Sequence, residues 1–486
     1  MINQHVNVME DHPKIARRVA AEGTALLKND RRTLPLKKQK KIGVYGEDAR
    51  LDPGGPNVCL DRGCNQGTLG SGWGSGTVDF EYLVEPLAAI RNKVESYGGV
   101  VTAITENNKT TEIAASAKRQ DICIVFINAD AGEEYIHWND TNGDQVNGDR
   151  PNLNAQKNGD NLVLAVSQNC DNTVVVVHSV GPIVLEKWVR KRQVRSIVWA
   201  HLPGLESGNA LVDILWGAVN PSGKLPYTIG KSLEDYGPGA QVLYETSGNP
   251  QQDMTNDILD LDYRYFDRQK IEPRYEFGFG LSYTTFKYGP IRKTRVAPLT
   301  PTYASRPAPG AKPPVYNSTI PTPEQAVYPE NFLRINRMVY PYLESADQVV
   351  VGDYPYPEGY DGEGQVPSQA GGAEGGNPGL WEVLYKVSFK LKNTGKVAGA
   401  EVAQLYIEPP QKAAVKFPKR QLRGFQKVFL KPGQEKTVEF SLTRRDLSYW
   451  DVVTQNWVVP TPGLGINVGS SSRKIHGRGW IRTEKY

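Results

Sequence analysis

The chain has 486 residues, of which 39% are hydrophobic and 23% charged, which is enough for two or three globular domains with sizeable cores. Its formal net charge is only +4, and its longest basic cluster is Lys37–Lys41, so no nucleic-acid partner is indicated. No apolar stretch reaches the roughly 18 to 20 residues that a membrane helix needs. The sequence therefore predicts a soluble protein without a membrane partner.

The first half of the chain predicts an α/β fold, because short β-branched runs alternate with amphipathic segments from Lys41 to about Thr228. The predicted strands are Lys41–Gly46, Val100–Ile104, Asp121–Asn128, Thr173–His178 and Ser196–His201. The predicted helices lie around Ile15–Ala21, Leu87–Val94, Leu162–Val166 and Leu211–Leu215, and in the third of them we expect Leu162, Leu164 and Val166 to share one face. This βαβα order predicts a mostly parallel sheet that is buried on both faces.

The composition changes between about Ala297 and Pro378, where Pro, Gly, Tyr and small polar residues dominate. Such a segment cannot bury much core of its own, so it is either a linker or a long insertion draped over a neighbouring domain. Its tyrosines favour the insertion, because aromatic residues are scarce in disordered segments.

From Trp381 onward, runs of period two predict a β-sandwich of about 100 residues. These runs are Tyr385–Leu391, Val402–Ile407, Gly424–Leu430 and Lys436–Leu442, with turn signals at Asn393–Gly395 and Lys431–Gly433. We therefore divide the chain into an α/β-sandwich domain (1–240), a connector that wraps back (241–296), the linker or insertion (297–378) and an all-β sandwich (379–486).

The loop after the predicted strand Asp121–Asn128 contains Asp130, Glu133 and Glu134, followed by Tyr135. Ligands of parallel α/β sheets bind beyond the carboxyl ends of the strands, so these acids are placed to reach a crevice. A carboxyl group there, with glycine beside it and an aromatic ring to shield it, could have a pKa high enough for general acid catalysis. The alternative is solvated surface charge, which the residues by themselves favour.

A second loop, Gly67–Thr77, has too many glycines for a helix or a strand and lacks the Gly-Lys-Ser/Thr ending of a phosphate-binding loop. Its tryptophan, Trp73, stands among small residues, which suits stacking against a sugar ring. A structural turn with Trp73 packed in a core explains the pattern equally well.

The cysteines and histidines indicate no further chemistry. Cys59 and Cys64 form either a short disulfide in a loop or two reduced thiols, whereas Cys123 lies in and Cys170 beside a buried strand, so no nucleophilic thiol is indicated. No Gly-x-Ser-x-Gly elbow occurs. Two histidines end strands without a partner at metal-ligand spacing, and we interpret them as structural; they are His178 and His201. We expect neither a metal nor a cofactor.

Taken in order, the motifs resemble glycoside hydrolase family 3. The segment Glu22–Asn29, followed by Leu34–Leu36, is similar to the opening of that family's α/β-sandwich domain. Further motifs that resemble the family are Gly132-Glu133 with Tyr135, Gly148–Arg150, His178–Pro182, Gly204–Gly208, Asn220–Pro226, Tyr275–Phe286, Asn393–Gly395 and Gln404–Tyr406. The segment around Cys59 and Cys64, the Gly72–Thr77 loop and the Pro/Gly-rich stretch resemble the fungal β-glucosidase branch.

The resemblance implies an α/β-sandwich domain followed by a fibronectin type III-like sandwich, in an enzyme that hydrolyses terminal β-D-glucosyl residues with retention and degrades cellulose or cellobiose. By its place in the motif, Glu133 would be the acid/base. Trp73, Ser75 and Tyr135 would contact the β-glucoside or cello-oligosaccharide substrate. In that family an N-terminal barrel-like domain carries the aspartate nucleophile.

Such a barrel needs on the order of 200 residues. None precedes Met1, and no aspartate of the chain lies in a matching nucleophile motif. We therefore expect an inactive or weakly active chain unless a separate barrel domain completes it. The alternative is a catalytically inactive carbohydrate-binding or interaction protein derived from such an enzyme.

The family resemblance implies an extracellular protein. Three glycosylation sequons agree with secretion, and they begin at Asn108, Asn139 and Asn317. The segment that starts at Met1 has no basic region followed by an apolar region, so we expect no secretory signal within the chain itself.

Overall fold

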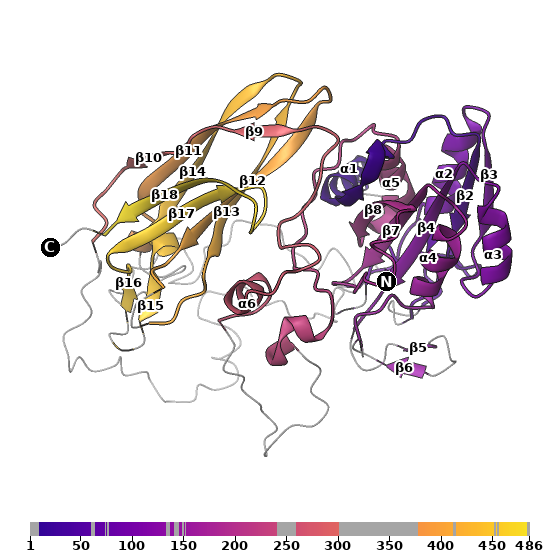
Figure 1. Cartoon of the computed structure of the whole chain (residues 1–486), viewed down its shortest axis with the longest axis horizontal. Coiled ribbons are helices and arrows are strands. Elements are labelled where there is room, and N and C mark those ends of the chain that lie inside the picture. Colours follow the sequence, from indigo (N-terminus) through magenta and orange to yellow (C-terminus); the bar gives the residue numbers. More distant parts are fainter. Residues whose placement is uncertain are drawn as a thin grey trace, which may run out of the picture.

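The computed structural model describes residues 9–59, 64–72, 74, 77–132, 137–139, 145–147, 150, 152–240, 259–300, 378–411, 415–451, 453 and 456–483. Figure 1 shows an α/β layered part, from indigo to magenta, and a β-sandwich in orange and yellow, with α6 (Tyr263–Gln269) between them in this view. Within the described ranges, every helix is too short or too polar to cross a bilayer.

A six-stranded sheet forms the centre of the α/β part, with the strand order β1-β8-β7-β4-β2-β3. Its strands are β1 (Ala25–Asn29), β2 (Lys41–Tyr45), β3 (Val100–Ile104), β4 (Ile122–Ala129), β7 (Thr173–Ser179) and β8 (Val194–His201). All five predicted strands are confirmed within two residues at each end, and they pair in parallel. The antiparallel edge strand β1 had not been predicted.

Helices cover both faces of this sheet. They are α1 (His12–Gly23), α2 (Pro86–Glu95), α3 (Thr110–Ala117), α4 (Gly159–Ser167) and α5 (Ser207–Leu215). Along β4, Ile124 and Phe126 pack with α1, α2 and α5, whereas Val125 and Ile127 pack with α3 and α4. Both β4 and β7 are buried along their whole length, which explains their continuous apolar sequences.

One predicted helix face is corrected by the structure. The core-facing residues of α4 are Leu162, Val163 and Val166, whereas Leu164 is only partly buried. The prediction had placed Leu164 on the core face together with Leu162, but residues two apart lie on different sides of an α-helix.

Two antiparallel sheets pack face to face in the β-sandwich and share one core. One sheet contains β9 (Phe286–Tyr288), β10 (Arg292–Arg295), β11 (Val383–Asn393) and β14 (Glu435–Thr443). The other contains β12 (Gly399–Glu408), β13 (Gln421–Leu430), β17 (Gly463–Gly469) and β18 (Ile475–Arg482). All four predicted sandwich strands are confirmed. The remaining strands had not been predicted, and β9 and β10 come from the segment expected to be a connector.

Two small hairpins and several short 3-10 helices complete the described elements. The hairpins are β5 (His137–Asn139) with β6 (Gln145–Asn147), and β15 (Tyr449–Asp451) with β16 (Asn456–Val458). The 3-10 helices are η1 (Asp30–Arg32), η2 (Glu47–Ala49), η4 (Gly204–Glu206), η5 (Glu234–Tyr236), η6 (Pro238–Ala240), η8 (Pro378–Trp381) and η9 (Arg445–Leu447).

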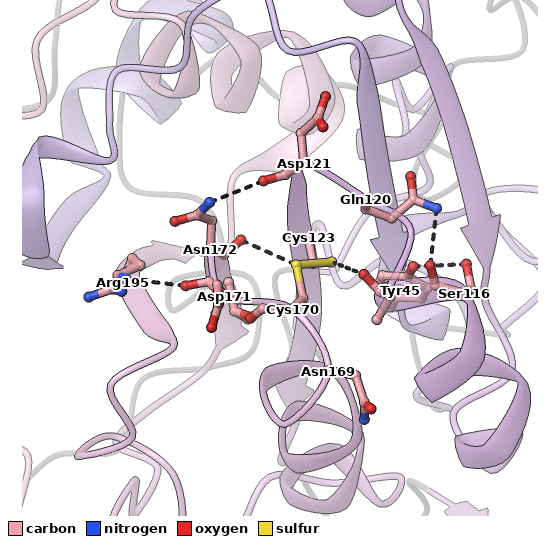
Figure 2. The surroundings of a disulfide bond; sticks show 12 residues. Tyr45, Ser116, Gln120, Asp121, Cys123, Asn169, Cys170, Asp171, Asn172 and Arg195 are labelled. Carbon is pink, nitrogen blue, oxygen red and sulfur yellow. Dashed lines mark hydrogen bonds between the residues drawn. A yellow bond between two sulfur atoms is a disulfide. The ribbon is translucent and has the colours of Figure 1, made fainter.

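The two disulfides of the structure lie in the α/β part. One links Cys59 to Cys64 within a loop, with the Cα atoms 5.2 Å apart. The other links Cys123, near the start of β4, to Cys170, which follows α4 (Figure 2). The sequence had not indicated this second pairing, because 47 positions separate the two cysteines.

Candidate active site

A buried polar cluster lies at the carboxyl ends of three neighbouring strands. Asp48 follows β2, Asn128 lies near the end of β4, and His178 lies near the end of β7; their side chains are at most 3% exposed. His178 Nδ1 lies 2.7 Å from Asp48 Oδ2, while Asn128 Nδ2 donates to Asp48 Oδ1 over 3.3 Å. The chain passes from β2 to β3 on one side and to β4 on the other, so this cluster occupies the switch point where α/β sheets bind ligands.

The turn after β2 brings Asp48 close to β4. Gly46 has a φ of 113°, and a Cβ atom at that position would lie 2.4 Å from the carbonyl oxygen of Phe126. Only glycine allows both this backbone conformation and this approach. The glycine between β2 and Asp48 is therefore a condition for the cluster.

Asn65 and Gln156 extend the cluster towards the loop that follows β4. Asn65 exchanges two hydrogen bonds with Asn128, at 3.0 and 3.1 Å, and donates to Gln156 Oε1 over 2.6 Å. Gln156 in turn accepts from the backbone N–H of Asp130 at 2.9 Å and donates to its carbonyl oxygen at 2.8 Å. The backbone of Asp130 is thus fixed three residues before Glu133.

The same cluster holds the glycine-rich loop. Asp48 Oδ1 accepts from the backbone N–H of Leu69 at 2.8 Å, and Asn65 is the residue that follows the Cys59–Cys64 disulfide. A Cβ atom on Gly72 would lie 3.4 Å from Asp130 Oδ1, so this loop passes directly against the start of the other one. The two loops singled out in the sequence therefore start side by side.

Arg150 and His201 border the cluster, and both are largely buried. Burial lowers the pKa of Arg150 to about 10, although the nearby Tyr227, Tyr236 and Asp130 oppose this. Its Nε and Nη2 atoms are buried and have no hydrogen-bond partner among the described residues. Burial, together with the neighbouring His178, lowers the pKa of His201 to about 4, so this imidazole is neutral at physiological pH.

Four of the predicted site residues lie outside the described residues: Glu133, Trp73, Ser75 and Tyr135. Their roles stay predictions. Of the three predicted glycosylation sites, Asn108 is exposed and accepts a hydrogen bond from Asn158 at 3.0 Å. Asn317 and the side chain of Asn139 also lie outside the described part. Within the part of the chain that the structure describes, no group of His, Cys, Asp and Glu is arranged to hold a metal ion.

Sequence reasoning missed the cluster itself. The sequence motifs predict structural histidines and give no role to Asp48, which is 130 positions from its partner His178. The available signal was an acidic residue directly after the first parallel strand of a sheet whose order reverses there. A spacing rule for metal ligands cannot detect such a pair.

The α/β part and the β-sandwich each match a domain model of a known family of carbohydrate-active enzymes. Residues 24–283 match the model for the glycosyl hydrolase family 3 C-terminal domain, and residues 401–472 match the fibronectin type III-like domain. Because the first match covers more than half of the chain, the chain belongs to glycosyl hydrolase family 3.

Its relatives include fungal proteins. The chain is 46% identical to a probable β-glucosidase E of Aspergillus oryzae over 98% of its own length and 48% of that relative. It is also similar to the solved structures of a Neurospora crassa family 3 β-glucosidase, at 41% identity and a TM-score of 0.79, and of a Chaetomium thermophilum β-glucosidase, at 39% and 0.80. Both comparisons cover 99% of this chain and 58% of the other. The chain thus spans about half the length of the curated relatives it matches.

Proposed function

We propose that this chain supplies the acid/base half of a retaining β-glucosidase that releases terminal glucose from β-glucosides or cello-oligosaccharides. Glu133 protonates the glycosidic oxygen as it leaves. The same glutamate then removes a proton from the water that hydrolyses the glycosyl-enzyme intermediate. The attacking aspartate comes from a barrel-like domain, on the same or on another polypeptide.

The observation that carries this proposal is the buried hydrogen-bond cluster at the switch point. It fixes the backbone of Asp130 through Gln156, and that of Leu69 through Asp48. These contacts support a catalytic role for the loops that continue to Glu133 and to Trp73, because a catalytic carboxyl needs a fixed start to its loop. A loop that carried only surface charge would not need its first residues to be fixed in this way.

The chemistry sets one further requirement. Retention needs two carboxyl groups about 5 to 5.5 Å apart on opposite sides of the sugar ring. Glu133 provides one of them, and the aspartate on the barrel-like domain provides the other. Ser75 touches the bound sugar, while Trp73 and Tyr135 flank its leaving-group side.

The setting of the enzyme follows from the same proposal. The protein acts outside the cell, in the degradation of cellulose or cellobiose. Asn108, Asn139 and Asn317 are its glycosylation sites, and the exposure of Asn108 supports the first of them. The two disulfides fit an oxidising compartment.

The test uses the full chain joined to the N-terminal part of the Aspergillus oryzae relative, and compares Glu133→Gln with the unchanged protein. On β-glucosides with poor leaving groups we expect kcat/KM to fall by about 10²-fold or more, because the glycosidic oxygen loses its proton donor. Activated aryl β-glucosides should lose far less in the glycosylation step. Glu112→Gln, which removes an exposed acid on α3, is the matched control. Equal loss on both substrate types would reject the role of Glu133.

A further inference from the structure

A separate pocket lies in the β-sandwich, far along the chain from the loops of the candidate active site. Its volume is about 160 Å³, and its lining residues include members of the end of β12, the start of β13 and the β15–β16 hairpin. Its wall combines aromatic rings with polar and cationic side chains: Phe417, Gln421, Arg423, Arg445, Tyr449 and Trp457. Nothing in the proposed glycosidase chemistry uses these residues.

Aromatic and aliphatic groups give this pocket the dimensions of a single ring. Phe417 and Tyr449 meet edge to face with their ring centroids 5.0 Å apart, and Trp457 supplies another aromatic wall. Two buried leucines, Leu447 and Leu464, close the inner side. A protein cavity of about 150 Å³ can hold a benzene molecule, so one six-membered ring fits a pocket of this size.

Arg423 gives the pocket a fixed positive charge. Its guanidinium donates to the carbonyl oxygens of Asp446, at 2.9 Å, and Leu422, at 3.2 Å, and to Oε1 of Gln421. Burial lowers the pKa of Arg423, as does the nearby guanidinium of Arg445, whereas Asp446 opposes the change. The side chain is therefore held in place by its own neighbours, because each of its three nitrogens donates to one of them.

Arg445 supplies the recognition group. Its guanidinium lies over the ring of Trp457, 4.1 Å from the centroid, and forms no hydrogen bond or ion pair with another described residue. Stacking uses the face of the guanidinium and leaves the N–H fork at its edge available, which matches the two oxygens of a carboxylate. No described residue that lines the pocket carries a carboxylate to compete for this fork.

We propose that this pocket binds a small ring-shaped carboxylate, with the ring against Tyr449 and Trp457 and the carboxylate on the guanidinium edge of Arg445. Two sources share this chemistry, a uronic acid sugar and an aromatic acid. The site is independent of Glu133, so it stands or fails separately from the proposed hydrolase function.

Isothermal titration of the full chain tests this proposal with two pairs of probes. The first pair is glucuronic acid and its neutral counterpart glucose, and the second is 4-hydroxybenzoic acid and 4-hydroxybenzyl alcohol. We expect one acid to bind at least about tenfold more tightly than its neutral partner, because only the acid engages the guanidinium fork. The pair that responds identifies the source.

Variants locate the binding. Arg445→Ala should weaken the acid about tenfold or more, and Arg445→Lys should recover only part of the affinity, because lysine keeps the charge and loses the fork. Arg478→Ala, which removes an exposed arginine from β18, should leave the affinity unchanged. Circular dichroism verifies that each variant is folded. If Arg445→Ala does not fold, Arg445→Lys alone tests the role of the guanidinium. The proposal is overturned if neither acid binds at millimolar concentration, if acid and neutral probe bind equally, or if Arg445→Ala binds like the unchanged chain.

Discussion

Asp48 is the residue on which the switch-point cluster depends. One of its oxygens lies 2.7 Å from His178, and the other accepts from Asn128 and from the backbone of Leu69. A carboxylate that is only 3% exposed is stable only when such donors replace its water. The hydrogen bonds to Asp48 therefore have two effects: they compensate its buried carboxylate for the loss of water, and they fix the glycine-rich loop at Leu69.

His201 should make the stability of the α/β part depend on pH. Burial and His178 lower its pKa from 6.5 to about 4 in the folded chain, so the unfolded chain binds the proton more tightly. Protonation therefore favours unfolding, and the stabilisation present above about pH 6.5 is lost as the pH falls towards 4. Between about pH 7.5 and pH 5, the protonation of His201 should lower the free energy of unfolding by about 2 kcal/mol.

Urea unfolding of His201→Asn at both pH values measures this effect. Asparagine suits the site because the backbone of His201 is left-handed, with a φ of 57°. The variant should lose less stability than the unchanged chain as the pH falls. His12→Asn, which removes an exposed histidine at the start of α1, should keep the full dependence. An unchanged pH dependence in His201→Asn would contradict the assignment.

At the scale of the elements, the central strands could be predicted because a strand that is buried on both faces appears in the sequence as a continuous run of apolar residues. In β7, four valines in a row precede His178, and all of β7 is buried. The edge strand β1 could not be predicted in this way, because its antiparallel pairing with β8 depends on contacts 170 or so positions away along the chain. The polar cluster could not be predicted from the sequence for the same reason, because its members come from separate strands and loops.

The two disulfides should differ in what they contribute to stability. The Cys123–Cys170 bond joins cysteines 47 positions apart, whereas the Cys59–Cys64 bond joins cysteines only 5 positions apart. A disulfide restricts the unfolded chain more when it closes a longer loop. The chain-entropy account gives about 4 kcal/mol for the long loop and about 2 kcal/mol for the short one. The double variant Cys123→Ala/Cys170→Ala should therefore unfold at lower urea than Cys59→Ala/Cys64→Ala. The reverse order would show that native contacts around the short loop dominate.

At the scale of the whole molecule, α6 joins the α/β part to the sandwich through buried charges. Asp267 lies 3.2 Å from Nε of Arg420 and 3.3 Å from Nη2 of Arg473. Aromatic contacts accompany these ion pairs. The ring of Tyr263 stacks on that of Phe277, with the centroids 4.7 Å apart, and lies edge to face with the ring of Tyr406, with the centroids 6.3 Å apart. The sandwich is thus attached by a specific interface rather than by a flexible tether.

Asp267→Asn should loosen this attachment. The side chains of Asp267 and Arg420 are 5% and 8% exposed, and removal of one charge leaves the other buried without its counter-ion, which typically costs about 3 kcal/mol or more. Glu272→Gln breaks an ion pair to the same Arg473, but Glu272 is 76% exposed, so this control should lose less than about 1 kcal/mol. Urea unfolding followed by tryptophan fluorescence compares the two. Because Arg420 directly precedes β13, Asp267→Asn should unfold the sandwich at lower urea than the control. Equal midpoints would contradict a role for the Asp267 ion pairs in the attachment.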